Sequence, residues 1–420
     1  MGKKIVILGT MDTKGKQLQF LKEKISKYGH EPILMDLSMG GRSHLQADIP
    51  SQEISWLGGM EFEKLIASKD RLSVTNTMGK GALQKTLALL SEDSLHGIVA
   101  LGGSSMALLG SKVMSKLPFG IPKVIATPAA MPVYVGTLFG ATDLVVIQMI
   151  MEIAGMNDLV KNAITQVAGA VAGMVAESLD YRSLRLPHPS IAVTEVGFSD
   201  QCAKYVEELL VKKGYHVFLF HAQGTSDRAM DRLISQGFFD GVIEIVPAGL
   251  IEAKFSGNRA ADMTRLDAAG ERGIPQVWAP CCLNMTGAGP TRAGREKYIA
   301  SGKVLHIDEM RAMARFPVDE MLVGARLYAE KINKSKGPIK LVIPLKGWSS
   351  LDQPGSILYN PEKDLLFVEE LKKNLHNPIE IEEIDANLED FMTAQVLVNS
   401  LEDLMDSNDE KKGGRINSEP

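Results

Sequence analysis

The feature that most constrains the fold of this sequence is a series of short, uninterrupted apolar runs, each followed by a polar turn and a stretch with helical spacing. The run at residues 4–9 is the first, and similar runs occupy residues 97–101 and 123–126. A strand that is apolar at successive positions is buried on both faces, as in parallel sheets that helices cover on both sides. The apolar stripe over residues 18–25 precedes another run at residues 32–36, which completes a strand–helix–strand unit. These runs predict an open, doubly wound α/β sheet.

A proline-containing segment divides the chain. Residues 186–189 read Leu-Pro-His-Pro, and two prolines this close disfavour a helix and remove backbone donors. A second alternating series begins directly afterwards, so we expect two tandem Rossmann-like α/β domains with mainly parallel sheets and an interdomain cleft. The strands expected in the second domain are residues 190–194, 216–220, 241–245, 275–278 and 339–343. The expected boundaries are residues 1–182 for the first domain, 183–189 for the linker, 190–405 for the second domain and 406–420 for a disordered polar tail.

Charge and cysteine content limit the classes of partner and the cellular compartment that we expect. The chain has 46 Lys plus Arg against 51 Asp plus Glu and no long basic run, so we expect no nucleic-acid partner. Its three cysteines, Cys202, Cys281 and Cys282, provide no disulfide framework, which indicates a reducing compartment. The apolar run at residues 5–8 is too short for a signal peptide. We therefore expect a cytoplasmic protein.

Residues 124–176 carry only four charged side chains, so protein must cover most of this stretch. Pro128, Pro132, Asp143 and Glu152 interrupt it, and no clean run of about 20 apolar residues is left to span a membrane. We expect no membrane association. The small residues near its end favour a buried helix, with a homodimer seam as the alternative.

Polar side chains follow the first expected strand at the point where it ends. Thr10, Asp12, Thr13 and Lys14 place hydroxyls, a carboxylate and an ammonium on one turn at the start of a helix. Ligands of open parallel sheets bind outside the carboxyl ends of the strands, where helix N-termini attract anions. This turn suits a phosphate, or a phosphate with Mg²⁺ bound to Asp12, although Asp12 or Thr13 could instead only cap the helix. Neither a Walker A motif nor a G-x-G-x-x-G motif is present here.

A second turn of the same kind follows the strand expected at residues 97–101. Gly102, Gly103, Ser104 and Ser105 would let the backbone approach an anion closely, although such turns are also common as plain connections. Asp36, at the end of another strand, could bind a ribose hydroxyl as in dinucleotide folds, or could simply be solvated.

The second domain has its own polar strand ends. His221 could act as an acid or base, although a hydrogen-bonded structural histidine is the alternative. Gly224 and Thr225 form the turn that follows it, and we expect them to contribute to cofactor binding. Glu244 lies between isoleucines within a strand, so it needs either a partner or a function. We expect Cys281 and Cys282 to be two packed thiols, because no cationic residue is local to them in the sequence.

A late loop combines Lys346 with hydroxyls and Asp352, which suits a ligand-facing role, and we expect both residues to belong to the catalytic group with His221 and Glu244. The eight histidines show no zinc-binding spacing, so magnesium with a nucleotide is the only metal we expect.

Taken in order, these turns resemble the Tm-one-like ATP-binding domain family over nearly the whole chain. The resemblance implies two α/β domains, ATP binding, and dimerisation. The matching segments are residues 7–15, 101–104, 134–136, 153–157, 220–225, 228–230, 273–277 and 344–352.

Three functions remain open on this reasoning. The first is nucleotide binding, in which the two turns of the first domain hold the phosphates of ATP through N–H groups and Lys14. The second is a metabolic enzyme of the lyase, hydrolase or isomerase type. It would act on a small carboxylated or phosphorylated metabolite in the interdomain cleft, with His221 or Glu244 as acid/base and Lys346 holding the anion. The third is a non-enzymatic interaction protein that uses residues 124–176 as its contact surface.

Overall fold

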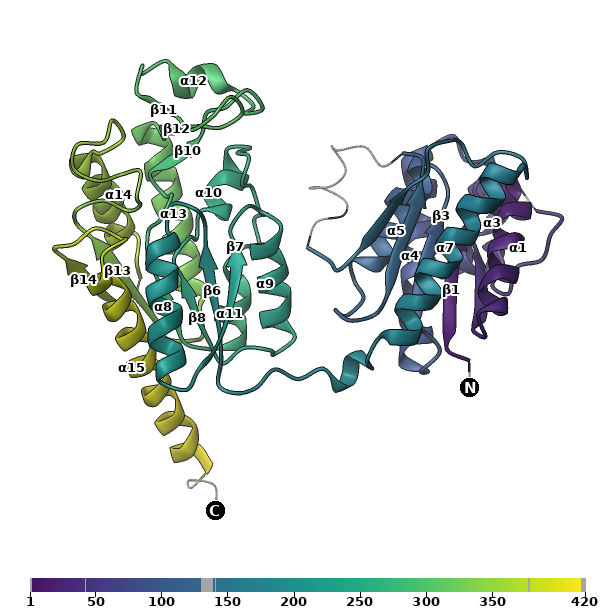
Figure 1. Cartoon of the computed structure of the whole chain (residues 1–420), viewed down its shortest axis with the longest axis horizontal. Helices are drawn as coiled ribbons and strands as arrows, with labels where there is room; N and C mark the ends of the chain where they lie inside the picture. The colour runs from purple at the N-terminus through teal and green to yellow at the C-terminus, as the bar shows by residue number, and fades with distance from the viewer. Residues whose placement is uncertain (1, 42, 130–138, 140, 377, 417–420) are drawn as a thin grey trace. The chain divides into compact units, whose positions relative to one another are not determined.

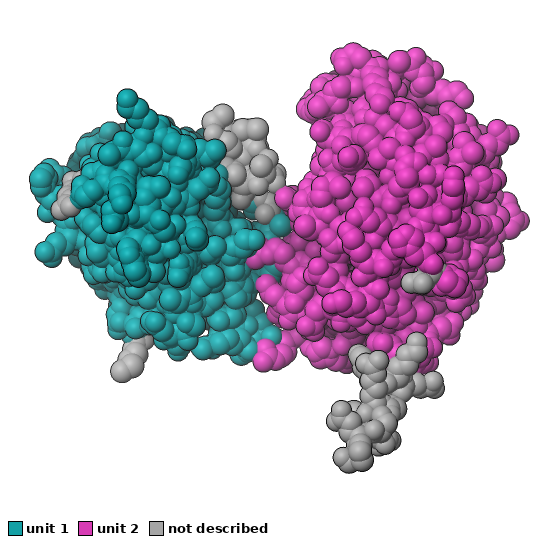
Figure 2. Space-filling view, turned by 180° about the vertical axis from the view of Figure 1, so that it is seen from behind, with its two compact units in different colours: residues 1–184 teal, residues 185–420 magenta. Residues whose placement is uncertain are grey.

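The computed structural model describes residues 2–41, 43–129, 139, 141–376 and 378–416. The chain divides into two compact units, Met1–Leu184 and Arg185–Pro420, which Figure 2 distinguishes by colour. Each unit contains its own parallel sheet with helices on both faces (Figure 1), which confirms the predicted fold class.

Unit 1 is built on a five-stranded parallel sheet in the order β2-β1-β3-β4-β5. Side chains of β1 alternate between two hydrophobic clusters, because successive residues of a strand point to opposite faces. Ile5 and Ile7 pack with helices α1 and α7, whereas Val6 and Leu8 pack with helices α2 to α5. The strands are β1 (Lys4–Gly9), β2 (Glu31–Asp36), β3 (Gly97–Leu101), β4 (Lys123–Thr127) and β5 (Val145–Gln148). The helices are α1 (Met11–Lys27), α2 (Ser51–Leu57), α3 (Phe62–Ala67), α4 (Arg71–Ser91), α5 (Ser104–Met114) and α7 (Asp158–Glu177), and a 3-10 turn, η2, covers Tyr181–Ser183.

Much of the weakly charged stretch 124–176 forms β4, β5 and α7, while residues 130–138 and 140 lie outside the described residues. Val160, Ile164 and Val167 of α7 are buried against the sheet. The segment Asp158–Ser183 is long and apolar enough to cross a membrane, by length and composition only. Core helices of soluble proteins pass the same test, so one such helix is weak evidence for a membrane span.

Unit 2 contains a six-stranded parallel sheet in the order β14-β13-β9-β8-β6-β7. Helices α8 and α15 pack together on one face, and α9, α11, α13 and α14 form a row of neighbours on the other (Figure 1). The strands are β6 (Ser190–Glu195), β7 (His216–His221), β8 (Gly241–Glu244), β9 (Gln276–Trp278), β13 (Ile339–Pro344) and β14 (Glu380–Ile384). The helices are α8 (Asp200–Lys212), α9 (Ser226–Ser235), α10 (Gly249–Lys254), α11 (Asp267–Arg272), α13 (Val318–Lys334), α14 (Pro361–Lys373) and α15 (Phe391–Ile416).

Two features of unit 2 differ from the sequence-based expectation. A small antiparallel sheet in the order β10-β12-β11 lies in the connection between β9 and β13, together with helix α12. Helix α15 continues to Ile416, past Asp406, where we expected the disordered tail to begin. The additional elements are β10 (Met285–Gly287), β11 (Val304–His306), β12 (Ala312–Arg315) and α12 (Arg295–Ile299).

Candidate functional site

The strand order of unit 1 places a topological switch point between β1 and β3. The helix that follows β1 and the helix that follows β3 lie on opposite faces of the sheet. The two connections therefore diverge at the carboxyl ends of these neighbouring strands. Open α/β sheets bind ligands at this position, and we call it the crevice between β1 and β3. The turns 10–14 and 102–105, which we predicted to bind phosphate, are the two connections that flank this crevice.

The N-terminus of α1 is already capped by two side chains, one on the last residue of β2 and one just after it. Met11 N–H donates to Asp36 Oδ1 at 2.9 Å, and Asp12 N–H donates to Ser38 Oγ at 2.9 Å. Ser38 also donates to Asp36 Oδ1, through its backbone N–H at 3.0 Å and through its hydroxyl at 2.5 Å. These bonds satisfy helix N–H groups that would otherwise attract an anion. The ribose contact expected of Asp36 would therefore have to use its other oxygen, Oδ2.

The N-terminus of α5 is open by comparison. Ser104 and Ser105 are exposed, and Gly103 precedes them in an extended conformation. A Cβ built on Gly103 would meet no atom of the described residues within 4 Å, whereas one built on Gly102 would approach Met106 Cβ to 2.7 Å. Gly102 is thus required for packing, and Gly103 leaves open space at the positive end of an 11-residue helix.

The turn after β1 supplies charged groups to the same edge of the sheet. Lys14 interrupts the helical backbone of α1, with φ −126° and ψ 18°. Its backbone N–H donates to Thr10 O at 2.9 Å, and its side chain makes no hydrogen bond or ion pair with the described residues. Asp12 Oδ2 accepts a hydrogen bond from Gly40 N–H at 3.0 Å, while Asp12 Oδ1 is buried with no partner among the described residues. Thr10 and Thr13 share a hydrogen bond of 2.8 Å between their hydroxyls. A partnerless carboxylate oxygen fits a cation that accompanies a phosphate.

Unit 2 has an equivalent switch point between β6 and β8, but the protein's own carboxylate lies there. Glu389 Oε2 accepts a hydrogen bond of 2.9 Å from Gln201 N–H, in the first turn of α8. Burial, opposed by this bond, raises the pKa of Glu389 to about 7. A carboxyl group at this helix N-terminus occupies the place that a phosphate would take. Sequence reasoning missed Glu389, because it lies beyond the last strand and far from α8 in the chain.

Glu244 has a structural partner that the sequence did not reveal. It is almost fully buried, and its Oε2 accepts hydrogen bonds from Arg265 at 2.6 Å and from the Thr194 hydroxyl at 3.0 Å. Arg265 is itself enclosed and also forms ion pairs with Asp231 at 2.8 Å and Asp227 at 3.5 Å. Burial raises the pKa of Asp231 to about 7, against the opposing effect of Arg265. The buried charge of Glu244 is therefore explained by an ion-pair network.

The remaining residues predicted for catalysis are not brought together. His221 Nδ1 lies 2.6 Å from Glu195 Oε1 at the end of the edge strand β7, and Lys346 Nζ lies 2.9 Å from Asp385 Oδ2 beyond β13. These strands are separated by four inter-strand intervals, or about 19 Å. Asp352 is buried and accepts a hydrogen bond of 2.6 Å from Asn284 Nδ2. One small metabolite in unit 2 could not contact both His221 and Lys346.

The turn after β7 has a packing role. Gly224 has φ +84°, and a Cβ built there would approach Ala260 O to 2.2 Å, so only glycine fits. Thr225 precedes α9, and its side chain makes no capping hydrogen bond. Both residues belong to a tight turn that contacts the chain after α10.

The expectation that no cation influences the cysteine pair is wrong for Cys282. Arg259, which lies 23 residues earlier, is buried beside the Cys282 sulfur and contributes to lowering the pKa of that thiol. Sequence distance concealed this contact. No group of three or more His, Cys, Asp or Glu side chains suited to a metal ion occurs within the described residues.

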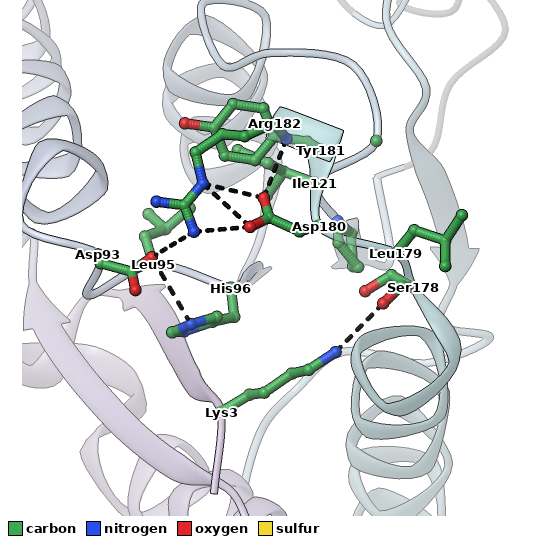
Figure 3. A pocket seen from close by; sticks show the side chains of 12 residues that line it. Lys3, Asp93, Leu95, His96, Ile121, Ser178, Leu179, Asp180, Tyr181 and Arg182 are labelled. Atoms are coloured by element: carbon green, nitrogen blue, oxygen red, sulfur yellow. Dashed lines mark hydrogen bonds and ion pairs between the residues drawn. The ribbon is translucent and has the colours of Figure 1, made fainter. Parts of the chain in front are cut away.

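A separate pocket of about 210 Å³ lies at the opposite edge of unit 1, before the amino ends of β1, β3 and β4 (Figure 3). Its charged groups bind one another: Arg182 pairs with Asp180 at 2.7 Å and with Asp93 at 3.0 Å. Lys3 Nζ donates to Val175 O at 2.7 Å at the end of α7. These contacts hold the end of unit 1 together, so the pocket is a poorer phosphate site than the crevice.

Comparison with known proteins identifies relatives along the whole chain. The model described as "Uncharacterised protein family (UPF0261) N-terminal domain" matches residues 3–180, and its C-terminal counterpart matches residues 188–405. A UPF0261 protein of Clostridium tetani is 33% identical over 407 residues, covering 97% of this chain and 100% of that protein. The ToMV resistance protein Tm-1(GCR237) of Solanum lycopersicum is 30% identical over 94% of this chain, which spans only 55% of the tomato protein.

Among solved structures, a UDP-N-acetylglucosamine 2-epimerase from Rickettsia bellii matches with 10% identity and a TM-score of 0.23. This match covers 66% of this chain and 79% of that protein. A similarity this low carries no argument about fold or substrate.

Proposed function

The chain belongs to the uncharacterised protein family UPF0261, and we propose that unit 1 of this member binds a nucleotide, ATP, at the crevice between β1 and β3. The observation that carries the proposal is the contrast between two helix N-termini at this crevice. Asp36 and Ser38 cap α1, whereas α5 is preceded by Gly103 and begins with two exposed serines, and no described atom lies within 4 Å of a Cβ built on Gly103. The phosphates would therefore lie at the start of α5.

The other predicted residues take roles that agree with this placement. Lys14 supplies a positive charge that no described residue neutralises, and the partnerless Asp12 Oδ1 supplies a ligand for Mg²⁺ bound to the phosphates. Ser104 and Ser105 offer hydroxyl and N–H donors to phosphate oxygens. Asp36 Oδ2, at the end of the strand next to β1, would accept a ribose hydroxyl.

The resemblance to an ATP-binding family supports ATP over other anions. The same resemblance supports a homodimer, and the composition supports a cytoplasmic location, which we include in the proposal. The enzymatic alternative loses support because His221 and Lys346 are far apart and Glu244 is held by Arg265. A small anionic metabolite remains the competing ligand for the crevice, and the interdomain cleft stays a prediction.

Calorimetric titration of the full-length protein tests the proposal. Mg-ATP, ADP, AMP and a panel of sugar acids and sugar phosphates would each be titrated into the wild type, Lys14→Ala and Lys16→Ala. Lys16 is an exposed lysine on the same helix and serves as the matched control. A charge-assisted hydrogen bond contributes about 1.5–3 kcal/mol, so we expect Lys14→Ala to weaken ATP binding at least tenfold, or about 1.4 kcal/mol, and Lys16→Ala to leave it unchanged.

Two results would overturn the proposal. The first is the absence of saturable nucleotide binding, with heat only from one small acid, which would assign the crevice to a metabolite. The second is equal ATP affinity for Lys14→Ala and Lys16→Ala.

A further inference from the structure

Unit 2 contains a pocket of about 280 Å³ between helix α14 and the last residues of strands β13 and β14, at one edge of the sheet (Figure 1). Its wall is mostly apolar and includes the buried side chains of Trp348 and Val368. Leu345 and Leu365 also line it and are 43% and 49% exposed, so the pocket opens to solvent. Sites for small molecules are lined in this way, and their usual volumes begin at about 300 Å³. The pocket therefore suits a ligand smaller than a nucleotide.

The charged side chains that line this pocket are all acidic. They belong to Glu362, Asp364 and Glu383. Glu383 is paired with Lys372 at 2.6 Å. Glu362 is exposed, and its carboxylate has no ion pair or hydrogen bond with the described residues. The negative charge of Glu362 is therefore available to a ligand at the mouth of the pocket.

A second negative charge lies in the wall itself. Asp364 is 4% exposed, and Arg315 pairs with its Oδ1 and also with Asp352 at 3.4 Å. Among the described residues, Arg315 is the only cation in ion-pair contact with either carboxylate, and Asp364 Oδ2 has no hydrogen-bond partner. Burial raises the pKa of Asp364 to about 7 against the charge of Arg315, and the charge of Asp352 adds to the rise. Two carboxyl groups thus share one positive charge beside the pocket.

Hydrogen-bond donors near the pocket are already in use, which disfavours an anionic ligand. Trp348 Nε1 donates to Pro344 O at 3.1 Å. At the start of α14, Pro361 has no backbone N–H, and Lys363 N–H donates to Asn360 Oδ1 at 3.1 Å. Free N–H groups are what make a helix N-terminus attract anions. The pocket therefore presents apolar surface together with negative charge.

We propose that this pocket binds a small organic cation, namely a primary ammonium group on an apolar body. The apolar body lies inside the pocket against Trp348 and Val368, and the ammonium group lies at the mouth beside Glu362. At the mouth the ammonium group keeps part of its hydration, so the cost of burying a charge is avoided. The charge at Glu362 and Asp364 selects a cation over a neutral or anionic molecule of the same shape.

Calorimetric titration of the full-length protein with hexylamine, hexanol and hexanoate tests the choice of ligand. The three probes have apolar chains of similar length and differ in charge. Hexylamine is protonated at pH 7.5, because the pKa of an alkyl ammonium group is about 10.4. An exposed ion pair changes affinity by up to about fivefold, so we expect hexylamine to bind about fivefold more tightly than hexanol. Hexanoate should bind more weakly than hexanol.

Two leucines of α14 test the place of binding. Leu365 lines the pocket, whereas its neighbour Leu366 does not line it and is 42% exposed. Leu365→Lys would place an alkyl ammonium group of the protein at the mouth, so we expect hexylamine to bind at least tenfold more weakly. Leu366→Lys adds the same charge outside the pocket and should leave the affinity unchanged. Melting temperature shows that each variant is folded.

A pair of acidic residues tests the charge in the same titration. Glu362→Gln should weaken the binding of hexylamine by about two- to fivefold and leave that of hexanol unchanged. Glu369→Gln is the matched control, because Glu369 is exposed on the same helix and does not line the pocket. No saturable binding of hexylamine would overturn the inference. Equal affinity for hexylamine and hexanol, or equal hexylamine affinity in Leu365→Lys and Leu366→Lys, would also overturn it.

Discussion

Replacing Arg265 is the most severe test of the conclusion that an ion-pair network accounts for the buried charge of Glu244. Its side chain is fully buried and forms ion pairs with Glu244 at 2.6 Å, Asp231 at 2.8 Å and Asp227 at 3.5 Å. Arg265→Met keeps much of the apolar volume but removes the positive charge. Two buried carboxyl groups, those of Glu244 and Asp227, and the partly buried carboxyl group of Asp231 would then lose this cation.

The magnitude follows from the cost of leaving buried charge without a partner. Removing one member of a buried ion pair typically destabilises a protein by about 3–5 kcal/mol. The carboxyl groups of the variant must bind protons in order to stay buried, which raises their folded-state pKa values. Protons are then bound by the folded state and not by the unfolded state, so the stability of the variant falls as the pH rises. The loss of unfolding free energy in Arg265→Met, relative to the wild type, should therefore be larger at pH 8 than at pH 5.5.

Urea unfolding followed by tryptophan fluorescence measures this effect. Trp278 and Trp348 are buried in unit 2, whereas Trp56 of unit 1 is 71% exposed, so the fluorescence change reports mainly on unit 2. Arg311→Met removes an exposed ion pair with Asp308 in the same unit and should change the midpoint little. A loss below about 1 kcal/mol for Arg265→Met, or a loss independent of pH, would refute the network as the reason for Glu244.

Two further predictions concern single side chains. The pKa of Asp231 is raised to about 7, so the folded state keeps a proton that the unfolded state loses near pH 4, and stability falls as the pH rises between these values. Asp231→Asn should reduce this loss of stability between pH 5 and pH 8, which the midpoints of urea unfolding at the two pH values measure. An equal loss in the wild type and in Asp231→Asn would contradict the prediction. Leu18 is fully buried against Gly9, where an added Cβ would approach it to 2.3 Å. Leu18→Ala should destabilise unit 1 by about 2–5 kcal/mol, seen as faster hydrogen exchange in α1, and unchanged exchange would count against this packing.

The parallel sheets could be predicted because burial on both faces makes a central strand apolar at every position. The runs at residues 4–9 and 97–101 are β1 and β3, and the run at residues 241–245 is β8 apart from its last residue. The antiparallel sheet could not be found in this way. Its strands β10, β11 and β12 are three or four residues long, too short to show a pattern.

The positions of the polar turns could also be predicted, because parallel strands end at one edge of a sheet. The partners of those residues could not. Arg265 follows Glu244 by 21 residues, and Arg259 precedes Cys282 by 23, so neither contact has a local signal. Only the fold brings these arginines to their partners, and it explains why Glu244 can be buried.

Mg-ATP binding by Gly103→Ala tests the central claim most directly. A Cβ at Gly103 meets no atom within 4 Å among the residues that the structure describes, so the variant should fold normally. The methyl group would nevertheless fill the space above α5 that the phosphates require. Gly173→Ala is the matched control, since its Cβ also meets nothing within 4 Å and it lies on α7. Calorimetric titration should show ATP binding weakened at least tenfold, or about 1.4 kcal/mol, in Gly103→Ala and unchanged in Gly173→Ala. Equal ATP affinity in the two variants would contradict a phosphate site at the start of α5.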